Sequence, residues 1–361
     1  MKGRIASDLV HKLSTDTDFR MYGAYLEYSL KRALTLRAGR QYMYAGLGGF
    51  TMDGGRVDLT IRRHLMLTAY GGSTPGPTFY DFDKVNDWSK SNAYGGHIKY
   101  SIMKTWTVGA SYLQQRFRKA TFVNAEGDTL HPQIWTDSQL GSLDISYSRN
   151  YCSAFGRADY DFIFKRVKMI TVMPSFKMEK GHSIGFEYTY RRPTLPFSNM
   201  FSVFDGKPYH QVRVNPVYKI NRDLYALGGA AWTKYSDAHN IRLNAGASYK
   251  GQSGGLVFAR GYEGVKLGVF GYLYYQMKSG PLFYLSGDAF NYKLDANADK
   301  TIGNVAASLG TKFKIIDGFA SRAEVQMLTN AQYKYDTRFY LKLEYAQKTI
   351  YGTTEYGGES R

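Results

Sequence analysis

Cysteine and proline are scarce in this chain. Cys152 is the single cysteine among 361 residues, and there are nine prolines. One thiol cannot form a disulfide within the chain, and Cys152 has no second thiol or nearby histidine at metal-ligand spacing. The 38 glycines follow no G-X-Y period, which together with the scarce prolines excludes a collagen-like or Pro-rich disordered chain. The sequence predicts a folded chain without disulfides.

Long apolar runs are also missing. No segment approaches the ~18 uninterrupted apolar residues of a membrane-spanning helix, and the longest candidate lies at 225–232. The first twenty residues contain no apolar core of a secretory signal. We therefore predict no transmembrane helix, and we expect that a signal was removed or that the chain begins inside a longer one.

Motifs of catalytic and cofactor chemistry are absent from the sequence. It contains no G-x-S-x-G, H-E-x-x-H, P-loop or C-x-x-C-H pattern. The 74–90 segment has several aspartates but not the spacing of a calcium loop. The seven histidines are scattered along the chain. We predict no enzyme, no cofactor and no metal site.

The charge is strongly basic, with 47 Lys and Arg against 30 Asp and Glu, a net charge of +17. These cations are spread singly, without a basic block or a recognisable nucleic-acid module. Nucleic acid is therefore not the expected partner, and an anionic lipid such as lipopolysaccharide fits dispersed surface cations better.

What the chain has in abundance is aromatic residues, 16% of the total, and an alternation of apolar with polar or small residues. In 240–249, Ile241, Leu243 and Ala245 alternate with Arg242 and Asn244. The same period of two recurs along nearly the whole chain and predicts strands with two different faces. We place strands at 2–11, 19–30, 33–43, 52–62, 65–73, 91–102, 105–119, 138–148, 154–164, 168–178, 183–191, 209–218, 223–234, 240–249, 254–261, 265–275, 281–291, 301–313, 318–328 and 336–346.

The connections between these twenty strands alternate in length. Tight turns such as 31–32, 63–64 and 103–104 are expected at one end, and long loops such as 74–90, 120–137 and 192–208 at the other. A soluble sandwich also alternates, because one face of each sheet is solvated. Strands of ~10 residues with aromatics near their ends on the apolar face match a membrane barrel better. We predict an all-β, antiparallel up-and-down transmembrane β-barrel of about 20 strands (18–22), over 1–346, with a tail at 347–361.

The segment 21–61 resembles the large porin-like outer-membrane β-barrels of Gram-negative bacteria. It carries Gly39-Arg40-Gln41 after a short turn and Asp53-Gly54-Gly55 leading into the next strand. The resemblance covers about forty residues. It implies a bacterial outer-membrane location, and the signature is a structural hairpin feature that supports the fold more strongly than any transported substrate.

In a membrane barrel the polar positions line the lumen, where water solvates unpaired charge. The expected pore-lining residues, with a basic surplus that favours anions weakly, are Arg37, Arg56, Lys99, Asp144, Arg157, Asp159, Asp161, Lys177, Glu187, Arg191, Arg213, Arg242, Lys312, Arg322, Glu324, Lys342 and Glu344. Many of these charges can instead form inter-strand pairs that rigidify the wall, with Arg157, Asp159 and Asp161 against Lys177 or Asp144.

The segment 192–208 is unusually stiff and apolar for a solvent-washed loop. It is a possible constriction loop, through Pro193, Pro196, Phe197, Phe201 and Phe204, or it packs on the barrel rim or a neighbouring subunit. The oligomeric state is left open by the sequence.

The expected function is a channel for passive diffusion of small hydrophilic solutes, embedded in outer-membrane lipid and lipopolysaccharide. One alternative is a scaffold or export conduit whose barrel encloses a polysaccharide or a periplasmic electron-transfer partner. A second is a barrel enzyme of the lipase type, which needs a Ser-His pair at the lipid-facing rim.

Overall fold

The computed structural model describes residues 2–6, 18–30, 33–44, 46–62, 64–74, 88, 91–117, 122–123, 129–130, 135–193, 207–261, 264–278, 280–293, 300–316, 319–330 and 335–345. Within these ranges it describes side chains from residue 23 on, except at 117–137 and 344–345. The chain divides into two compact units, one of Met1–Met178, Ser183–Val214 and Thr233–Asp237 and one of Glu179–His182, Asn215–Trp232 and Ala238–Arg361.

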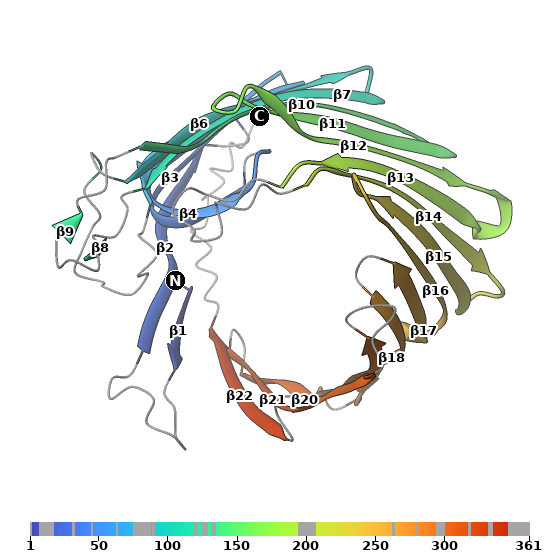
Figure 1. The fold of residues 1–361 in the computed structure, drawn as a ribbon. Coiled ribbons are helices and arrows are strands. Elements are labelled where there is room, and N and C mark those ends of the chain that lie inside the picture. Colours follow the sequence, from blue (N-terminus) through green and yellow to red (C-terminus); the bar gives the residue numbers. More distant parts are fainter. Residues whose placement is uncertain are drawn as a thin grey trace, which may run out of the picture. The chain divides into compact units, whose positions relative to one another are not determined.

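Strands make up nearly all of the described structure (Figure 1). The first unit contains β1 (Lys2–Ala6), β2 (Asp18–Leu30), β3 (Leu34–Tyr44), β4 (Gly49–Ile61), β5 (Leu65–Ser73), β6 (Asn92–Ile102), β7 (Trp106–Phe117), β8 (Phe122–Val123), β9 (Thr129–Leu130), β10 (Trp135–Arg149), β11 (Cys152–Asp161), β12 (Arg166–Lys177) and β13 (Ser183–Arg191). The second contains β16 (His239–Tyr249), β17 (Gln252–Gly261), β18 (Gly264–Gln276), β19 (Leu282–Lys293), β20 (Ile302–Ile316), β21 (Phe319–Thr329) and β22 (Asp336–Tyr345). Both contribute to β14 (Tyr209–Lys219) and β15 (Leu224–Lys234), and a short 3-10 turn covers Glu179–Gly181.

The strands pair in an antiparallel up-and-down order. In the first unit each strand from β1 to β7 pairs with the next, β7 pairs with β10, and β10 to β13 continue the series. In the second unit β16 to β22 pair in the same consecutive way. The predicted all-β, antiparallel up-and-down fold is therefore confirmed, and apart from the separate β8–β9 pair the described strands number twenty.

The predicted strand limits agree closely with those observed, and β5 begins and ends at the predicted residues. The first strand is described over Lys2–Ala6, and the remainder of its predicted range, 7–11, lies outside the described residues. The short strands β8 and β9 had no predicted counterpart. The prediction of a single domain over 1–346 stays a prediction, and the tail at 347–361 lies outside the described residues.

Within each unit one end of the strands carries only short connections, as predicted, while the other end carries the long ones together with the shorter 45–48, 162–165 and 262–263. In the first unit 31–33, 62–64, 103–105 and 150–151 are short, whereas 74–91 and 192–208 join the strands at their other ends. In the second unit 250–251, 277–281 and 317–318 are short, and 294–301 is the longer connection. Five short connections place a cation at positive φ, namely Arg62, Lys104, Lys165, Lys180 and Lys250.

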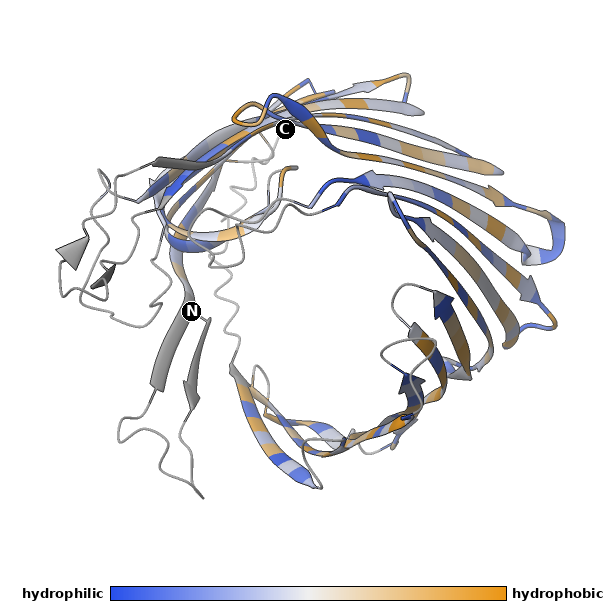
Figure 2. Ribbon diagram, viewed as in Figure 1, coloured by the Kyte–Doolittle hydropathy of each residue, from blue (hydrophilic) through white to orange (hydrophobic). Residues whose placement is uncertain are grey.

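In a soluble protein the apolar face of a strand is buried and the polar face is exposed. In this chain the exposure of the two faces is reversed. On β10 the apolar Leu143 is 67% exposed, while its polar neighbour Ser142 is 5% exposed. Among the described side chains, more polar than hydrophobic residues are buried, and large apolar side chains such as Leu26, Leu309 and Phe339 are exposed. Figure 2 shows apolar and polar residues alternating along the strands. We call these the apolar face and the polar face.

One small apolar cluster interrupts the polar face of the first unit. It is formed by Met43, Met52, Tyr70, Leu113 and Leu140, together with Leu47 from the β3–β4 connection. Tyr70 lies opposite Gly95 in the β5–β6 ladder, and its ring occupies the space that a side chain at Gly95 would need. Within the described residues, no helix is long and apolar enough to span a membrane.

Candidate functional site

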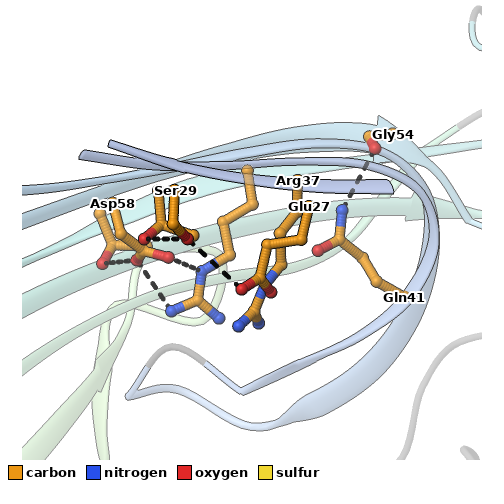
Figure 3. A network of polar contacts seen from close by, with 9 residues as sticks. Glu27, Ser29, Arg37, Gln41, Gly54 and Asp58 are labelled. Carbon is orange, nitrogen blue, oxygen red and sulfur yellow. Dashed lines mark hydrogen bonds and ion pairs between the residues drawn. The ribbon is translucent and has the colours of Figure 1, made fainter. Parts of the chain in front are cut away.

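Charged side chains of neighbouring strands converge on the polar face of the first unit. Residues that lie opposite in a ladder project from the same face, so Glu27, Arg37 and Arg56 form one row across β2, β3 and β4. Arg37 Nε donates to Glu27 Oε2 at 2.6 Å. Figure 3 shows this pair beside Asp58.

Arg56 lies opposite another arginine, Arg37, and finds its partner on its own strand. Its Nε and Nη2 donate to the two oxygens of Asp58 at 2.7 and 2.8 Å. Thr68 on β5 adds a third hydrogen bond to Asp58, at 2.6 Å. Like charges opposite one another destabilise a sheet, and each arginine of this row is offset by its own carboxylate.

A second group surrounds Arg157 on β11. Arg157 donates through Nε and Nη2 to Asp159 at 2.6 and 3.0 Å, and it lies opposite Asp144 in the ladder with β10. The Asp144 carboxylate occupies the space beside Gly109, where an added Cβ would lie 2.5 Å from both oxygens. Lys99 lies opposite Gly109 on the next strand, in the same row as Asp144.

The expected inter-strand pairing of this group differs from the structure in two respects. Arg157 bonds to Asp159 within one strand, because residues two apart share a face. Asp161 accepts hydrogen bonds from the backbone N–H groups of Ile163 and Phe164 at 3.0 and 3.1 Å, so it caps the turn after β11. Lys177 lies opposite Ser183, at the short-turn end of β12.

The remaining expected residues of the first unit also project from the polar face. Arg191 lies in the row of Asp159, through Met169 between them. Glu187 accepts a hydrogen bond from Arg213 Nη1 at 3.2 Å, and Gln211 accepts one from Arg213 Nη2. This part of the polar face therefore mixes both signs of charge.

In the second unit the polar face carries an aromatic and ionic network. Arg322 Nε donates to the Tyr284 hydroxyl and its Nη2 to Glu324 Oε2, both at 2.7 Å. Tyr284 donates to the same carboxylate oxygen. Lys312 and Lys342 lie opposite Arg322 on either side. Arg242 lies in a row with Lys266 across Ala259, and the backbone of Glu344 lies opposite Ala320.

These positions establish which predicted residues share a face, and their role as pore lining stays a prediction. Pro193 is half-buried. Pro196, Phe197, Phe201 and Phe204 lie outside the described residues, as does most of 74–90, so inward folding of a constriction loop also stays a prediction.

Two features of the structure were not anticipated from the sequence. The first is aromatic side chains on the polar face of β18 and β19. Tyr284 lies opposite Gly310, and Phe290 opposite Gly268, so that each ring covers a glycine on the next strand. The sequence contained a sign of this arrangement in 264–276. There the aromatic residues Phe270, Tyr272 and Tyr274 occupy every second position, and Val269, Gly271 and Leu273 precede them one by one.

The second is the chemistry of the Gly-Arg-Gln and Asp-Gly-Gly signature. Arg40 donates through two nitrogens to the two oxygens of Asp53, each at 2.6 Å, across the β3–β4 ladder. Gln41 Nε2 donates to the Gly54 carbonyl at 3.2 Å (Figure 3). At Gly39, with φ of 125°, an added Cβ would lie 2.4 Å from the carbonyl oxygen of Ala24. The signature thus locks a hairpin, consistent with its interpretation as a structural feature.

A histidine and a serine meet on the polar face, at His97 and Ser111. His97 Nδ1 and Ser111 Oγ are 2.8 Å apart, and Ser111 is buried. The lipase-type alternative needs a Ser-His pair on the apolar face, at the rim, whereas these two residues project from the polar face of β6 and β7. Among the described residues, no three His, Cys, Asp or Glu side chains are grouped to hold a metal ion.

Comparison with known proteins yields only distant likenesses. No family model matches, and no curated protein matches. The P pilus usher (PapC) translocation pore is 14% identical over 88% of this chain and 60% of that chain, with a TM-score of 0.37. The E. coli tip assembly intermediate PapC-PapD-PapK-PapG is 13% identical, over 87% and 37%, at 0.40. OmpT, an outer membrane protein of Vibrio cholerae, is 11% identical, over 83% and 88%, at 0.35. The chain thus spans about 60% of the usher pore that it matches.

Proposed function

We propose that the chain is an outer-membrane β-barrel protein that forms a channel for small hydrophilic solutes, with a weak preference for anions. The observation that carries this proposal is the inversion of the two faces. Apolar side chains are exposed in alternation along the strands, while ion pairs occupy the opposite face. Lipid solvates the first face and water the second.

The loop pattern supports the same environment. Short turns at one end and longer loops at the other are the usual arrangement of bacterial outer-membrane barrels, whose short turns face the periplasm. Aromatic residues near the short turns are exposed, with Tyr28, Trp106, Tyr218 and Tyr249 as examples. Amphipathic rings at this level suit the boundary between hydrocarbon and headgroups.

Anion preference is supported by the charge balance of the polar face. Several of its cations already have a carboxylate partner, among them Arg37, Arg56 and Arg157. The basic surplus that remains is small against the net charge of +17 of the whole chain. A hydrated wall with such a surplus raises the local concentration of anions modestly.

The decisive experiment is the conductance of the purified chain in a planar bilayer, with the reversal potential measured in a potassium chloride gradient. A stepwise conductance with chloride passing somewhat better than potassium supports the proposal. Clear cation selectivity refutes the charge argument. Absence of conductance refutes the channel and favours a scaffold or export conduit enclosing a partner.

A further inference from the structure

Two adjoining grooves cross the apolar face of β2 to β7, and we propose that they hold the acyl chains of one anionic phospholipid whose headgroup is bound at the short turns. The inference deepens the proposed function, because it rests on the location of the apolar face in the outer-membrane bilayer. It names a lipid partner for one part of that face and does not depend on conduction.

The larger groove lies over β4, β5, β6 and β7 and has a volume of about 560 Å³. Small residues make room for it, because Ala69 lies opposite Gly96 and Ala110 lies opposite Ile98. Larger side chains of the apolar face that line it are Val57, Leu59, Leu67 and Ile98. An apolar hollow gives an acyl chain dispersion contacts on more sides than a smooth wall does.

The smaller groove lies over β2, β3 and β4 and has a volume of about 260 Å³. Small residues again meet across a ladder, with Ala38 opposite Gly55. Leu26, Tyr28 and Leu36 line this groove from the apolar face. Val57 lines both grooves, so they adjoin. Two adjoining hollows match the two acyl chains of a diacyl lipid.

The order of residues along the strands matches the layers of one leaflet. Arg62 and Lys104 lie in short turns, and the exposed Trp106 begins the next strand. Leu59 and Val57 are three and five residues before Arg62, which is about 10 and 17 Å along the strand. The hydrocarbon of one leaflet is about 15 Å deep. Cation, aromatic ring and groove therefore coincide with the headgroup, the interface and the acyl chains.

The two turns present their cations together. Arg62 lies in the β4–β5 turn and Lys104 in the β6–β7 turn, and both side chains are exposed. The backbone N–H of Ser101 donates to the carbonyl of His64 at 2.8 Å, so the turns lie at one level, about 10 Å or two strand spacings apart. Cations at a membrane surface attract anionic lipid. Charge complementarity thus selects an anionic headgroup above the grooves.

The same charges argue against a second copy of this chain as the occupant. Copies that insert in the same orientation would bring Arg62 and Lys104 of both chains to one level if they met through these grooves. Like charges repel at such an interface. An anionic phospholipid instead offsets the two cations and fills the apolar hollows with the same molecule.

The test is native mass spectrometry of the purified full-length chain in detergent, titrated with dioleoylphosphatidylglycerol. Phosphatidylcholine with the same chains and lysophosphatidylglycerol are separate probes. The wild type is expected to bind one phosphatidylglycerol at a lower concentration than either of the others. Phosphatidylcholine lacks the net negative charge, and the lysolipid lacks one of the two chains.

The headgroup contacts are tested by Arg62→Gln/Lys104→Gln. The matched control Lys180→Gln/Lys278→Gln removes two cations from exposed short turns of the second unit. Loss of both headgroup cations should weaken phosphatidylglycerol binding at least ~10-fold, and phosphatidylcholine binding should change less. The control should stay within about twofold of the wild type.

The chain contacts are tested by Ala69→Leu/Ala110→Leu, which fills the larger groove with side chains that suit a lipid-facing surface. The matched control Ala245→Leu/Ala247→Leu makes the same change at exposed positions of the apolar face of β16. Displacement of an acyl chain loses dispersion contacts and should weaken phosphatidylglycerol binding at least about threefold. The control should bind the lipid as the wild type does.

The outcomes separate this site from the channel. Equal binding of phosphatidylglycerol and phosphatidylcholine by the wild type, or an equal loss in a test variant and its control, overturns the site. Oligomers that dissociate in Ala69→Leu/Ala110→Leu without selective lipid binding assign the grooves to a second copy and also overturn it. Conductance of the same preparations tests the channel independently. A conducting chain without selective lipid binding refutes only the site, and selective binding without conductance refutes only the channel.

Discussion

At the scale of single residues, arginines of the described polar face bond repeatedly to a carboxylate two positions away on the same strand. Arg56–Asp58, Arg157–Asp159, Arg322–Glu324 and Asp336–Arg338 all follow this spacing. Residues two apart share a face of a strand, so an Arg-x-Asp or Asp-x-Arg pattern neutralises itself without a partner strand. Because both charges of such a pair lie on one strand, the pair does not favour one register of the neighbouring strands over another.

Arg40 and Asp53 form a different kind of pair, because they join two strands and are mostly covered. Their side chains are 11% and 18% exposed. Removing one member should leave a covered charge without its partner, and Arg40→Met is expected to destabilise the folded chain by about 3 kcal/mol. The measurement is urea unfolding of the protein refolded in lipid vesicles.

The control for this prediction is the double variant Arg40→Met/Asp53→Leu, which removes both charges. It should recover most of the lost stability, because a buried ion pair and apolar residues of similar size are often close in energy. Arg338→Met, at a more exposed pair, is expected to change the stability much less than Arg40→Met does, because solvent screens the charge. A single Arg40→Met variant as stable as the wild type would contradict the locking role of the signature.

Outside the strands, Lys207 and Asp237 form an exposed ion pair between two connections of the first unit. Lys207 Nζ donates to Asp237 at 2.7 Å, and this bond, with a weaker one from Ser236, lowers the pKa of Asp237 below its ordinary value of 3.8. Because the pKa of Asp237 is lowered in the folded state, the pair stabilises the connection at pH values above the ordinary pKa of 3.8. It is lost as the pH falls through the lowered pKa.

The expected result is an Asp237 carboxyl that titrates below 3.8 in a pH series followed by NMR. Lys207→Gln should raise the pKa of Asp237 toward 3.8, and Ser236→Ala should raise it by less, because the lysine bond is the larger cause. An unchanged titration in Lys207→Gln would show that the pair does not form in solution.

At the scale of the strands, the structure shows how much the sequence could predict. The period of two placed β5, β13 and β16 closely, and the apolar alternation is strict in β13 and β16. It could not reveal β8 and β9, which have two residues each and no room for a period. Nor could it show that Asp161 caps a turn, since that role depends on how the backbone leaves β11.

The alternation in the sequence predicted which residues share the polar face, but not which of them lie opposite one another on neighbouring strands. Lys312, Arg322 and Lys342 each belong to a polar set in the sequence, yet their alignment in one row follows only from the register of two ladders. Register depends on turn geometry and on the packing of both faces, and a shift by one residue would place these cations on the other face. Which charges pair with each other, and which lie in one row across the sheet, could therefore be learned only from the structure.

The two faces of β16 give a direct test of the environment of the sheet. Leu243 is exposed on the apolar face, and Asn244 lies on the polar face beside Gly229. Leu243→Arg is expected to destabilise the protein by about 2–4 kcal/mol if this level lies near the bilayer midplane. Asn244→Arg should be nearly neutral, because its side chain remains among polar groups and water.

Both variants are to be measured by urea unfolding in the same vesicles, with wild-type protein alongside. Equal penalties for the two positions would contradict the assignment of lipid to one face and water to the other. Retention of a monodisperse wild-type protein in buffer without detergent would contradict it independently and would favour a soluble sheet.

For the whole molecule, the question is whether ion preference follows the polar face or the net charge of +17. Surface charges act weakly beyond a Debye length of about 10 Å at 0.1 M salt, so cations at exposed turns should contribute little to selectivity in a channel. Cations on the polar face act directly on a permeating ion. The two sources of charge can be separated by variants that remove the same number of cations from each.

The variant Arg191→Gln/Arg213→Gln/Arg242→Gln removes three cations from the polar face and should shift the reversal potential toward cation preference in a potassium chloride gradient. The control Arg62→Gln/Lys104→Gln/Lys278→Gln removes three from exposed turns, and its reversal potential should stay close to that of the wild type. A single substitution is expected to change little, because counter-charges such as Glu187 and water compensate. An equal shift in both triple variants would assign the preference to the surface field, and an unchanged potential in the first would remove the polar face as its origin.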